Sequence, residues 1–209
     1  VTPDAERTMR THLGAAITFA PEHVKKEDFT GCGHAHIEGY VLFNPELMLA
    51  TLAAAKAAGC TISVDLASFE VVHASQPILH KLLKEYVDIV FANEEEAEAF
   101  TGSSNPQKGL EILAEVCDTV AVKIGEKGAL LCHEGECCHV SATVVDEVID
   151  TTGAGDFWAA GFLYGLLLGK SLQESGSIGA LLGGAVVACE GTALPENQWH
   201  ELRNSANSK

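Results

Sequence analysis

The stretch Asp150–Asp156 reads DTTGAGD, and the apolar, helix-like run Phe157–Gly169 follows it directly. Glycine adopts backbone angles that other residues avoid and allows a ligand to approach the main chain closely. The first N–H groups of a helix have no intrahelical partners and lie at its positive end. We therefore expect Gly153, Ala154 and Gly155 to offer several main-chain donors to one anion.

The second acid of this stretch, Asp156, falls in the first turn of the expected helix. A carboxylate repels a resting phosphate, so its position beside the expected donors indicates a role in handling a proton. The alternative is an ordinary loop, in which Asp150 or Thr151 caps the helix and the glycines form the turn. Short glycine motifs occur often by chance, so the stretch alone does not decide between the two.

Composition limits the classes of function. The chain has 209 residues, of which 47% are hydrophobic, and a formal net charge of −16. That charge argues against binding to nucleic acid or to an anionic membrane surface. The seven cysteines are odd in number, and neither a secretory signal nor a membrane-spanning run is visible. We expect free thiols and a cytoplasmic location, with organellar targeting left open because of the N-terminus described next.

The chain begins at Val1 rather than at a methionine. The segment TPDAER predicts a hairpin turn at Pro3 and Asp4, between Val1 and the alternating stretch Thr8–Leu13. A strand at Val1 would have no preceding partner strand, although a ladder needs one. We therefore interpret N-terminal material as missing from this sequence.

Strands and helices are expected to alternate along the chain. Helical spacing or helix-start signals are found at residues 45–60, 75–87, 94–102 and 106–117, and again from Asp156 and from about Leu172. Apolar strands are expected at residues 61–66, 88–93 and 119–125, a hairpin at 129–140 about Glu134-Gly135, an extended segment at 141–150 and a frayed tail at 204–209. This order predicts an α/β fold, a Rossmann-like and mostly parallel sheet with helices on both faces.

Three candidate segments follow expected strands: residues 93–96, 125–128 and 150–156. Ligands of such folds bind at the carboxyl ends of the strands, so we expect the three to converge at one edge of the sheet. The segment after Asp65 also follows a strand end, but only its position makes it a candidate for the border of the cleft.

The motifs together resemble the ribokinase-like (PfkB) family of carbohydrate and nucleoside kinases. Besides DTTGAGD, the resemblance is carried by VTPDAERTMRTHLGA (1–15), NEEEAEAF (93–100), VAVKIGEKGAL (120–130) and VACEGTALP (187–195). It implies a single α/β kinase domain over residues 1–209, about the C-terminal two thirds of such a kinase. Residues 1–15 would leave the lid, while the N-terminal strand and most of the lid would be missing.

The resemblance implies an ATP-dependent phosphotransferase that moves the γ-phosphate to an alcohol group of a ribose-, fructose- or adenosine-like substrate. Asp156 would be the general base, and the N–H groups of Gly153, Ala154 and Gly155 would hold the developing charge. A homodimer is one option for its assembly. The alternative to an active kinase is a non-catalytic relative that serves as a binding or scaffold subunit. A nicotinamide-dependent oxidoreductase is disfavoured, because no GxGxxG motif follows an early strand.

The family's remaining site residues are carried over as expectations. Nucleotide contacts fall on Asn93, Lys123, Gly125, Glu126, Gly128, Thr152 and Gly155. Glu96 would bind Mg²⁺, largely through water. A K⁺ ion stays an option, and its ligands would be Asp150, Thr152 and the loop around Gly191. The alternatives are an exposed helix-start acid at Glu96, an ion pair at Lys123, a turn cap at Asp150 and ordinary turns at the loop glycines.

Two further clusters are less promising. The segment CHEGECCHV suggests zinc, but on a hairpin its alternate residues would face opposite sides; its candidates are Cys132, His133, Cys137, Cys138 and His139. His34 and His36 share one face of an expected strand, where two ordinary histidines are the simpler interpretation.

Overall fold

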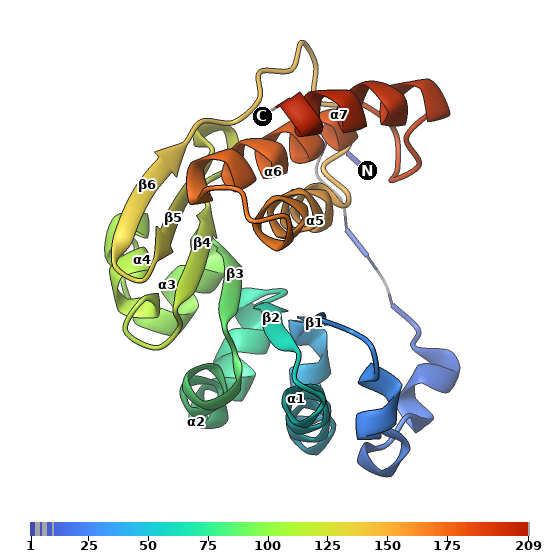
Figure 1. Cartoon of the computed structure of the whole chain (residues 1–209), viewed down its shortest axis with the longest axis vertical. Coiled ribbons are helices and arrows are strands. Elements are labelled where there is room, and N and C mark those ends of the chain that lie inside the picture. Colours follow the sequence, from blue (N-terminus) through green and yellow to red (C-terminus); the bar gives the residue numbers. More distant parts are fainter. Residues whose placement is uncertain (3–4, 6–7, 10, 209) are drawn as a thin grey trace. The chain divides into compact units, whose positions relative to one another are not determined.

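The computed structural model describes residues 1–2, 5, 8–9 and 11–208 (Figure 1). The turn predicted at Pro3 and Asp4 lies outside the described residues. Of the described residues before Gly14, none belongs to a strand, so the alternation in Thr8–Leu13 does not produce one there. None of the helices in the described part is long and apolar enough to cross a lipid bilayer.

The chain divides into two compact units, which are described separately. The sheet unit comprises His12–Lys123 and Cys132–Cys137, and the helical unit comprises Val1–Thr11, Ile124–Leu131 and Cys138–Lys209. The hairpin β5–β6 contributes to both, since its tip belongs to the sheet unit. Hydrogen bonding orders the strands β1-β2-β3-β4-β5-β6 in one sheet, which confirms the predicted α/β class.

The sheet unit follows the predicted alternation. Its strands are β1 (His34–Glu38), β2 (Thr61–Asp65), β3 (Ile89–Asn93) and β4 (Thr119–Lys123), and each neighbouring pair is parallel. Its helices are α1 (Pro45–Ala58), α2 (Phe69–Tyr86), α3 (Glu94–Thr101) and α4 (Pro106–Leu113), with short 3₁₀ turns η1 (Gly14–Thr18), η2 (Pro21–His23), η3 (Lys26–Phe29) and η4 (Gly39–Phe43). Residues in the middle of β2, β3 and β4 are buried, as parallel strands covered by helices require.

Side-chain caps explain where the helices of the sheet unit begin. Asn44, Asn93 and Asn105 each accept a hydrogen bond from an N–H group in the first turn of α1, α3 and α4. Ser68 does the same for α2, which therefore starts six residues before the predicted start at Ser75. The left-handed Gly59, with φ of 88°, ends α1 at Ala58, within the range 45–60 predicted as helical.

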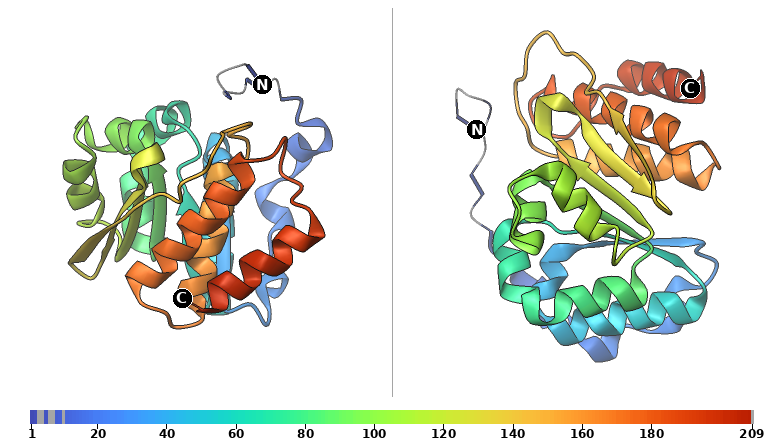
Figure 2. Two further views of the ribbon diagram at one scale, coloured as in Figure 1. Left: turned by 90° about the horizontal axis from the view of Figure 1, so that it is seen from above. Right: turned by 90° about the vertical axis from the view of Figure 1, so that its left-hand side faces the viewer.

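The helical unit contains η5 (Gly125–Lys127), α5 (Ala154–Leu167), α6 (Leu172–Val187) and α7 (Glu196–Ser208), together with parts of β5 (Ala129–His133) and β6 (Glu136–Val140). Strands β5 and β6 form a hairpin (Figure 2). It turns at Glu134 and Gly135, as predicted, and the φ angles of these residues, 48° and 86°, are left-handed. Two expectations were wrong: residues 141–150 form no strand, and the tail predicted to fray is helical to Ser208.

Glycines allow α5 and α6 to pack closely. A Cβ atom at Gly161 would lie 2.8 Å from the Ile178 carbonyl oxygen, and one at Gly179 would lie 2.9 Å from the Trp158 carbonyl oxygen. Any side chain at these two positions would force the helices apart. Gly161 and Gly179 are therefore packing residues of this helix pair.

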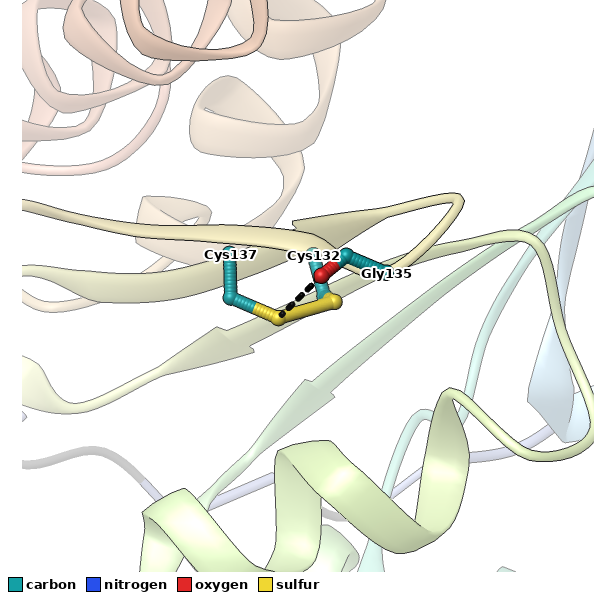
Figure 3. The surroundings of a disulfide bond; sticks show 3 residues. All are labelled: Cys132, Gly135 and Cys137. Carbon is teal, nitrogen blue, oxygen red and sulfur yellow. Dashed lines mark hydrogen bonds between the residues drawn. A yellow bond between two sulfur atoms is a disulfide. The ribbon is translucent and has the colours of Figure 1, made fainter.

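The cysteines do not all remain free thiols. Cys132 and Cys137 lie opposite one another across the hairpin, with Cα atoms 4.1 Å apart, and form a disulfide (Figure 3). This corrects the expectation of free thiols for two of the seven cysteines. It also removes two of the zinc candidates, and His133 instead contacts the Thr119 hydroxyl.

Candidate active site

In the helical unit, the turn Asp150–Asp156 is built around the buried carboxylate of Asp150. Its Oδ1 atom accepts hydrogen bonds from the Thr152 hydroxyl at 2.6 Å and the Thr152 N–H at 2.9 Å. Its Oδ2 atom accepts one from the Gly191 N–H at 2.9 Å. The Thr152 hydroxyl, followed by the two N–H donors, lowers the pKa of Asp150. The structure thus brings together Asp150, Thr152 and Gly191, with the contacts that a turn cap makes.

The helix α5 begins within this turn. Gly153 is its N-cap, with a left-handed φ of 77°. The Ala154 N–H donates to the Thr151 carbonyl at 3.2 Å, and the Phe157 N–H donates to the Gly153 carbonyl at 2.9 Å. Among the described residues, the N–H groups of Gly153 and Gly155 have no partner. Two of the three expected anion donors therefore remain unused in this structure.

Asp156 lies in the first turn of α5, and this residue is exposed. Hydrogen bonds to α6 fix the position of this turn, because the Ile149 and Asp150 N–H groups both donate to the Val187 carbonyl at the end of that helix. A fixed turn of this kind holds main-chain donors, which suit an anionic group, and an exposed acid, which can accept a proton from a neighbouring hydroxyl, within one short segment.

Directly beside this turn lies a pocket of about 460 Å³. Its walls are the loop before Ile149, the small residues of α6 and part of α7; they include Val144, Val145, Ile149, Gly184, Ala185 and Ala188. The walls also include Thr143, Asp146, Glu147 and Gln198, so the volume and the mixed lining suit a flat group with a polar edge, such as a nucleobase. Sequence reasoning missed this pocket, although the small residues of α6 were a usable signal that a ligand can approach that helix.

The loop after β4 turns tightly at its glycines. The Ile124 N–H donates to the Gly128 carbonyl at 2.8 Å, and Gly125 and Gly128 have left-handed φ angles of 58° and 101°. A Cβ atom at Gly128 would lie 1.9 Å from the Val140 carbonyl oxygen, so only glycine fits there. Gly125 and Glu126 are exposed on this loop.

In the sheet unit, Asn93 and Glu96 form a reciprocal cap at the start of α3. The Glu96 N–H donates to Asn93 Oδ1 at 2.8 Å, while the Asn93 N–H and side-chain amide donate to the two oxygens of the Glu96 carboxylate. Glu96 is only 3% exposed, which rules out the alternative of an exposed helix-start acid. The carboxylate is therefore fixed in position by its neighbours.

Lys123 adopts the ion-pair alternative in this structure. Its Nζ lies 2.7 Å from Asp65 Oδ2, and both side chains are mostly buried. Asp65 and Lys123 end β2 and β4, with β3 between them, so they meet at the carboxyl edge of the sheet. Sequence reasoning used Asp65 only as a strand end and did not identify it as the partner of Lys123.

The environment of Glu96 disfavours its charged form. Burial, followed by the negative charge of Asp65, raises the pKa of Glu96 to about 7, while Lys123 acts in the opposite direction. A cation placed at this carboxylate would favour the ionised form and would replace the lost solvation. Among the described residues, no cluster of three or more His, Cys, Asp and Glu side chains could hold a metal unaided. A divalent ion here would therefore need water or ligand oxygens as well.

Glu96 should make stability depend on pH. The pKa is about 7 in the folded state against 4.5 ordinarily, so the folded chain binds this proton more tightly than the unfolded chain. Stability is then highest below the unfolded pKa and is lost as the pH rises through the folded one. Relative to Glu96→Gln, the wild type should lose on the order of 1–3 kcal/mol between about pH 5 and about pH 8, as measured by urea unfolding.

The matched control for this experiment is Glu94→Gln, which removes an exposed carboxylate from the same helical turn. Its unfolding free energy should follow the wild-type curve at each pH. Parallel curves for the wild type and Glu96→Gln would contradict the raised pKa.

Comparison with known proteins identifies the family. The profile described as the pfkB family carbohydrate kinase matches residues 1–199. The chain belongs to the PfkB family. This PfkB chain is 31% identical over 196 residues to an adenosine kinase from Schizophyllum commune, covering 81% of this chain and 56% of that protein.

Solved structures agree with the family assignment. The crystal structure of adenosine kinase from Sinorhizobium meliloti matches 98% of the PfkB chain and 64% of its own, with a TM-score of 0.90 and 34% identity. An E. coli structure, provisionally described as a ribokinase II in complex with ATP and Mg²⁺, matches 93% of this chain and 65% of its own, with a TM-score of 0.78 and 25% identity. The PfkB chain thus spans less than two thirds of the length of each of these three relatives.

Proposed function

We propose that this protein is an ATP-dependent kinase that moves the γ-phosphate of ATP to an alcohol group of a sugar or a nucleoside. The start of α5 carries the proposal, since unused main-chain donors and the carboxylate of Asp156 share one short turn. The relatives support it, because two are described as adenosine kinases and one was solved with ATP and Mg²⁺.

In the proposed reaction, Asp156 accepts the proton of the attacking hydroxyl group. The N–H groups of Gly153 and Gly155 donate to the transferring phosphoryl group, whose charge they stabilise without rearranging. The Ala154 N–H would join them if it gave up its bond of 3.2 Å to the Thr151 carbonyl. In this proposal, the group that removes the proton and the groups that stabilise the charge all belong to the four consecutive residues from Gly153 to Asp156.

The pocket beside this turn fits the base of ATP. Its small α6 residues leave room for a planar ring, and Ile149 in its wall directly precedes Asp150 of the phosphate-facing turn. Thr152 and the loop of Gly125, Glu126 and Gly128 are the further nucleotide contacts that we propose. The close approach of Gly128 to the Val140 carbonyl shows why this loop cannot carry a side chain there.

The donor set at the start of α3 fits Mg²⁺. Glu96 supplies one fixed carboxylate and Asn93 one amide oxygen, which are ligands that Mg²⁺ accepts directly or through water. When bound, Mg²⁺ would neutralise charge on the phosphates of ATP. Lys123 keeps further N–H donors beside the one directed at Asp65, so it could donate to a phosphate while this ion pair stays in place.

The decisive experiment measures phosphate transfer from ATP to adenosine, ribose and fructose. Transfer to one of these acceptors is expected, together with inactivity of Asp156→Asn. Binding of ATP and of an acceptor without transfer would instead support the alternative of a non-catalytic subunit. The proposed partner is thus a small sugar or nucleoside rather than nucleic acid or a membrane. We propose that the protein is located in the cytoplasm. Homodimerisation stays a prediction.

Potassium is expected to raise turnover. Asp150, Thr152 and the Gly191 loop supply hard oxygen ligands next to the proposed anion donors, and a cation there would strengthen them electrostatically. At fixed ionic strength, turnover should be higher in K⁺ than in Na⁺ or tetramethylammonium, and Asp150→Ala should lose this selectivity. Fixed ionic strength is needed because a chain of charge −16 also responds to general screening. Equal turnover in all three cations would leave Asp150 as a turn cap only.

A further inference from the structure

The ion pair of Asp65 and Lys123 reaches across one strand at the carboxyl edge of the sheet unit. Asp65 ends β2 and is paired in register with Phe91 of β3. Lys123 ends β4 and is paired with Asn93, the last residue of β3. Asp65 Oδ1 accepts the Ala67 N–H at 3.0 Å, and Oδ2 accepts a hydrogen bond from Lys123 Nζ at 2.7 Å. The Lys123 side chain is therefore directed over the end of β3 towards Asp65.

A second buried carboxylate, that of Glu96, is bound to the residue that pairs with Lys123. The N–H and the side-chain amide of Asn93 donate to its two oxygens at 2.8 Å and 2.7 Å. A carboxylate offers about four acceptor positions, so Asn93 leaves about half of them for other partners. Besides burial, which is the largest cause, Asp65 raises the pKa of Glu96 and Lys123 lowers it. Glu96 is thus an alternative anionic partner for the Lys123 ammonium group.

The choice between the two carboxylates matters because the ammonium group is held away from water. The side chains of Lys123 and Asp65 are 16% and 12% exposed. A desolvated charge without its partner is costly, so a lysine that loses one carboxylate is expected to turn to the next. On Glu96, the ammonium group would fill acceptor positions that a metal ion or its water needs, and its charge would repel the metal.

We propose that Asp65 is a positioning residue, which holds Lys123 away from Glu96 and so keeps the Glu96 carboxylate available to Mg²⁺. The inference rests on the proposed function, in which Glu96 binds Mg²⁺ beside the phosphates of ATP. Asp65 then keeps apart two opposite charges that would otherwise neutralise each other. Lys123 stays at the edge of the sheet as a phosphate donor, and Glu96 stays ready for the metal.

The test measures how strongly Mg²⁺ favours binding of a non-hydrolysable ATP analogue, adenylyl imidodiphosphate, to the full chain. Calorimetry gives the dissociation constant of the analogue in EDTA and in saturating Mg²⁺, and the ratio of the first to the second is called the metal coupling. Asp65→Asn keeps an oxygen for the Ala67 N–H but loses the charge that holds Lys123. Its metal coupling should fall about tenfold or more, as when other residues that orient a metal ligand are replaced.

The double variant Asp65→Asn/Lys123→Met separates positioning from the effect of charge alone. If Asp65 acts through Lys123, adding Asp65→Asn to the Lys123→Met chain should change the metal coupling by no more than about twofold. Equal losses with and without Lys123 would show that Asp65 attracts the metal by its own charge, and would overturn the proposal. The same comparison decides the matter if Asp65→Asn alone does not fold, because the double variant contains no unpaired buried lysine.

Glu111→Gln is the matched control, because it removes the acid of an exposed ion pair, whose Lys108 Nζ lies 3.0 Å from Glu111 Oε2. Its metal coupling should equal that of the wild type. Unchanged coupling in Asp65→Asn would overturn the inference and leave the proposed function standing. A wild-type chain that binds the analogue equally well in Mg²⁺ and in EDTA would remove the Mg²⁺ site from the proposed function, and the inference with it.

Discussion

If the proposed function holds, replacing Asp156 by asparagine is expected to lower the rate of phosphate transfer by about 10²- to 10⁴-fold, because the attacking hydroxyl would lose the general base that we propose. Asparagine has nearly the same shape, and the main-chain donors of Gly153 and Gly155 stay in place. The dissociation constant for ATP should therefore change little. Turnover and ATP binding are measured on the same preparation, so that loss of folding is not mistaken for loss of catalysis.

The control for this variant is Asp118→Asn, which removes an exposed carboxylate just before β4, at the amino end of that strand. Its turnover should equal that of the wild type, although its net charge changes by the same amount. Wild-type turnover in Asp156→Asn would show that another group accepts the proton.

The second large effect is expected at Gly153. A valine there would have to adopt a φ of 77°, and its Cβ atom would lie 2.7 Å from Cγ2 of Thr192. Left-handed strain and this close contact together should cost on the order of 2–4 kcal/mol of unfolding free energy. The turn that presents the N–H groups would also shift, so turnover should fall by at least about 10²-fold.

Gly169→Val separates these causes. Gly169 has a nearly identical φ of 75°, but a Cβ atom there would have no neighbour within 4 Å. This variant should show the strain without the contact and should keep its turnover. Equal losses of stability and turnover in the two variants would mean that Gly153 acts through backbone strain alone.

Local signals predicted most of the fold. The acid-rich segment predicted the start of α3, and Glu134-Gly135 predicted the hairpin turn, because helix starts and left-handed turns depend on neighbouring residues only. The failures depended on tertiary structure. The β-branched segment 141–150 looks like a strand but pairs with none, and instead forms a wall of the pocket.

The resemblance already grouped Asp150 with Thr152 and the Gly191 loop, but the partner of Lys123 could not be predicted from the sequence. Lys123 was recognisable as a strand-end cation, whereas its partner Asp65 lies 58 positions away and meets it only through the strand order. The exposure of Glu96 was likewise undecided until the fold buried it. The pocket needed three separate segments, so no short motif could predict it.

Because the donors at the start of α5 belong to the main chain, exchanging a side chain does not delete them. Mutation affects them through backbone geometry, and Gly153 is the residue that sets this geometry. Directed evolution towards a new acceptor alcohol should therefore hold Gly153 fixed and diversify residues elsewhere. A library built in this way would keep the backbone geometry of the proposed phosphate-binding turn in most members, which leaves substrate preference as the property under selection.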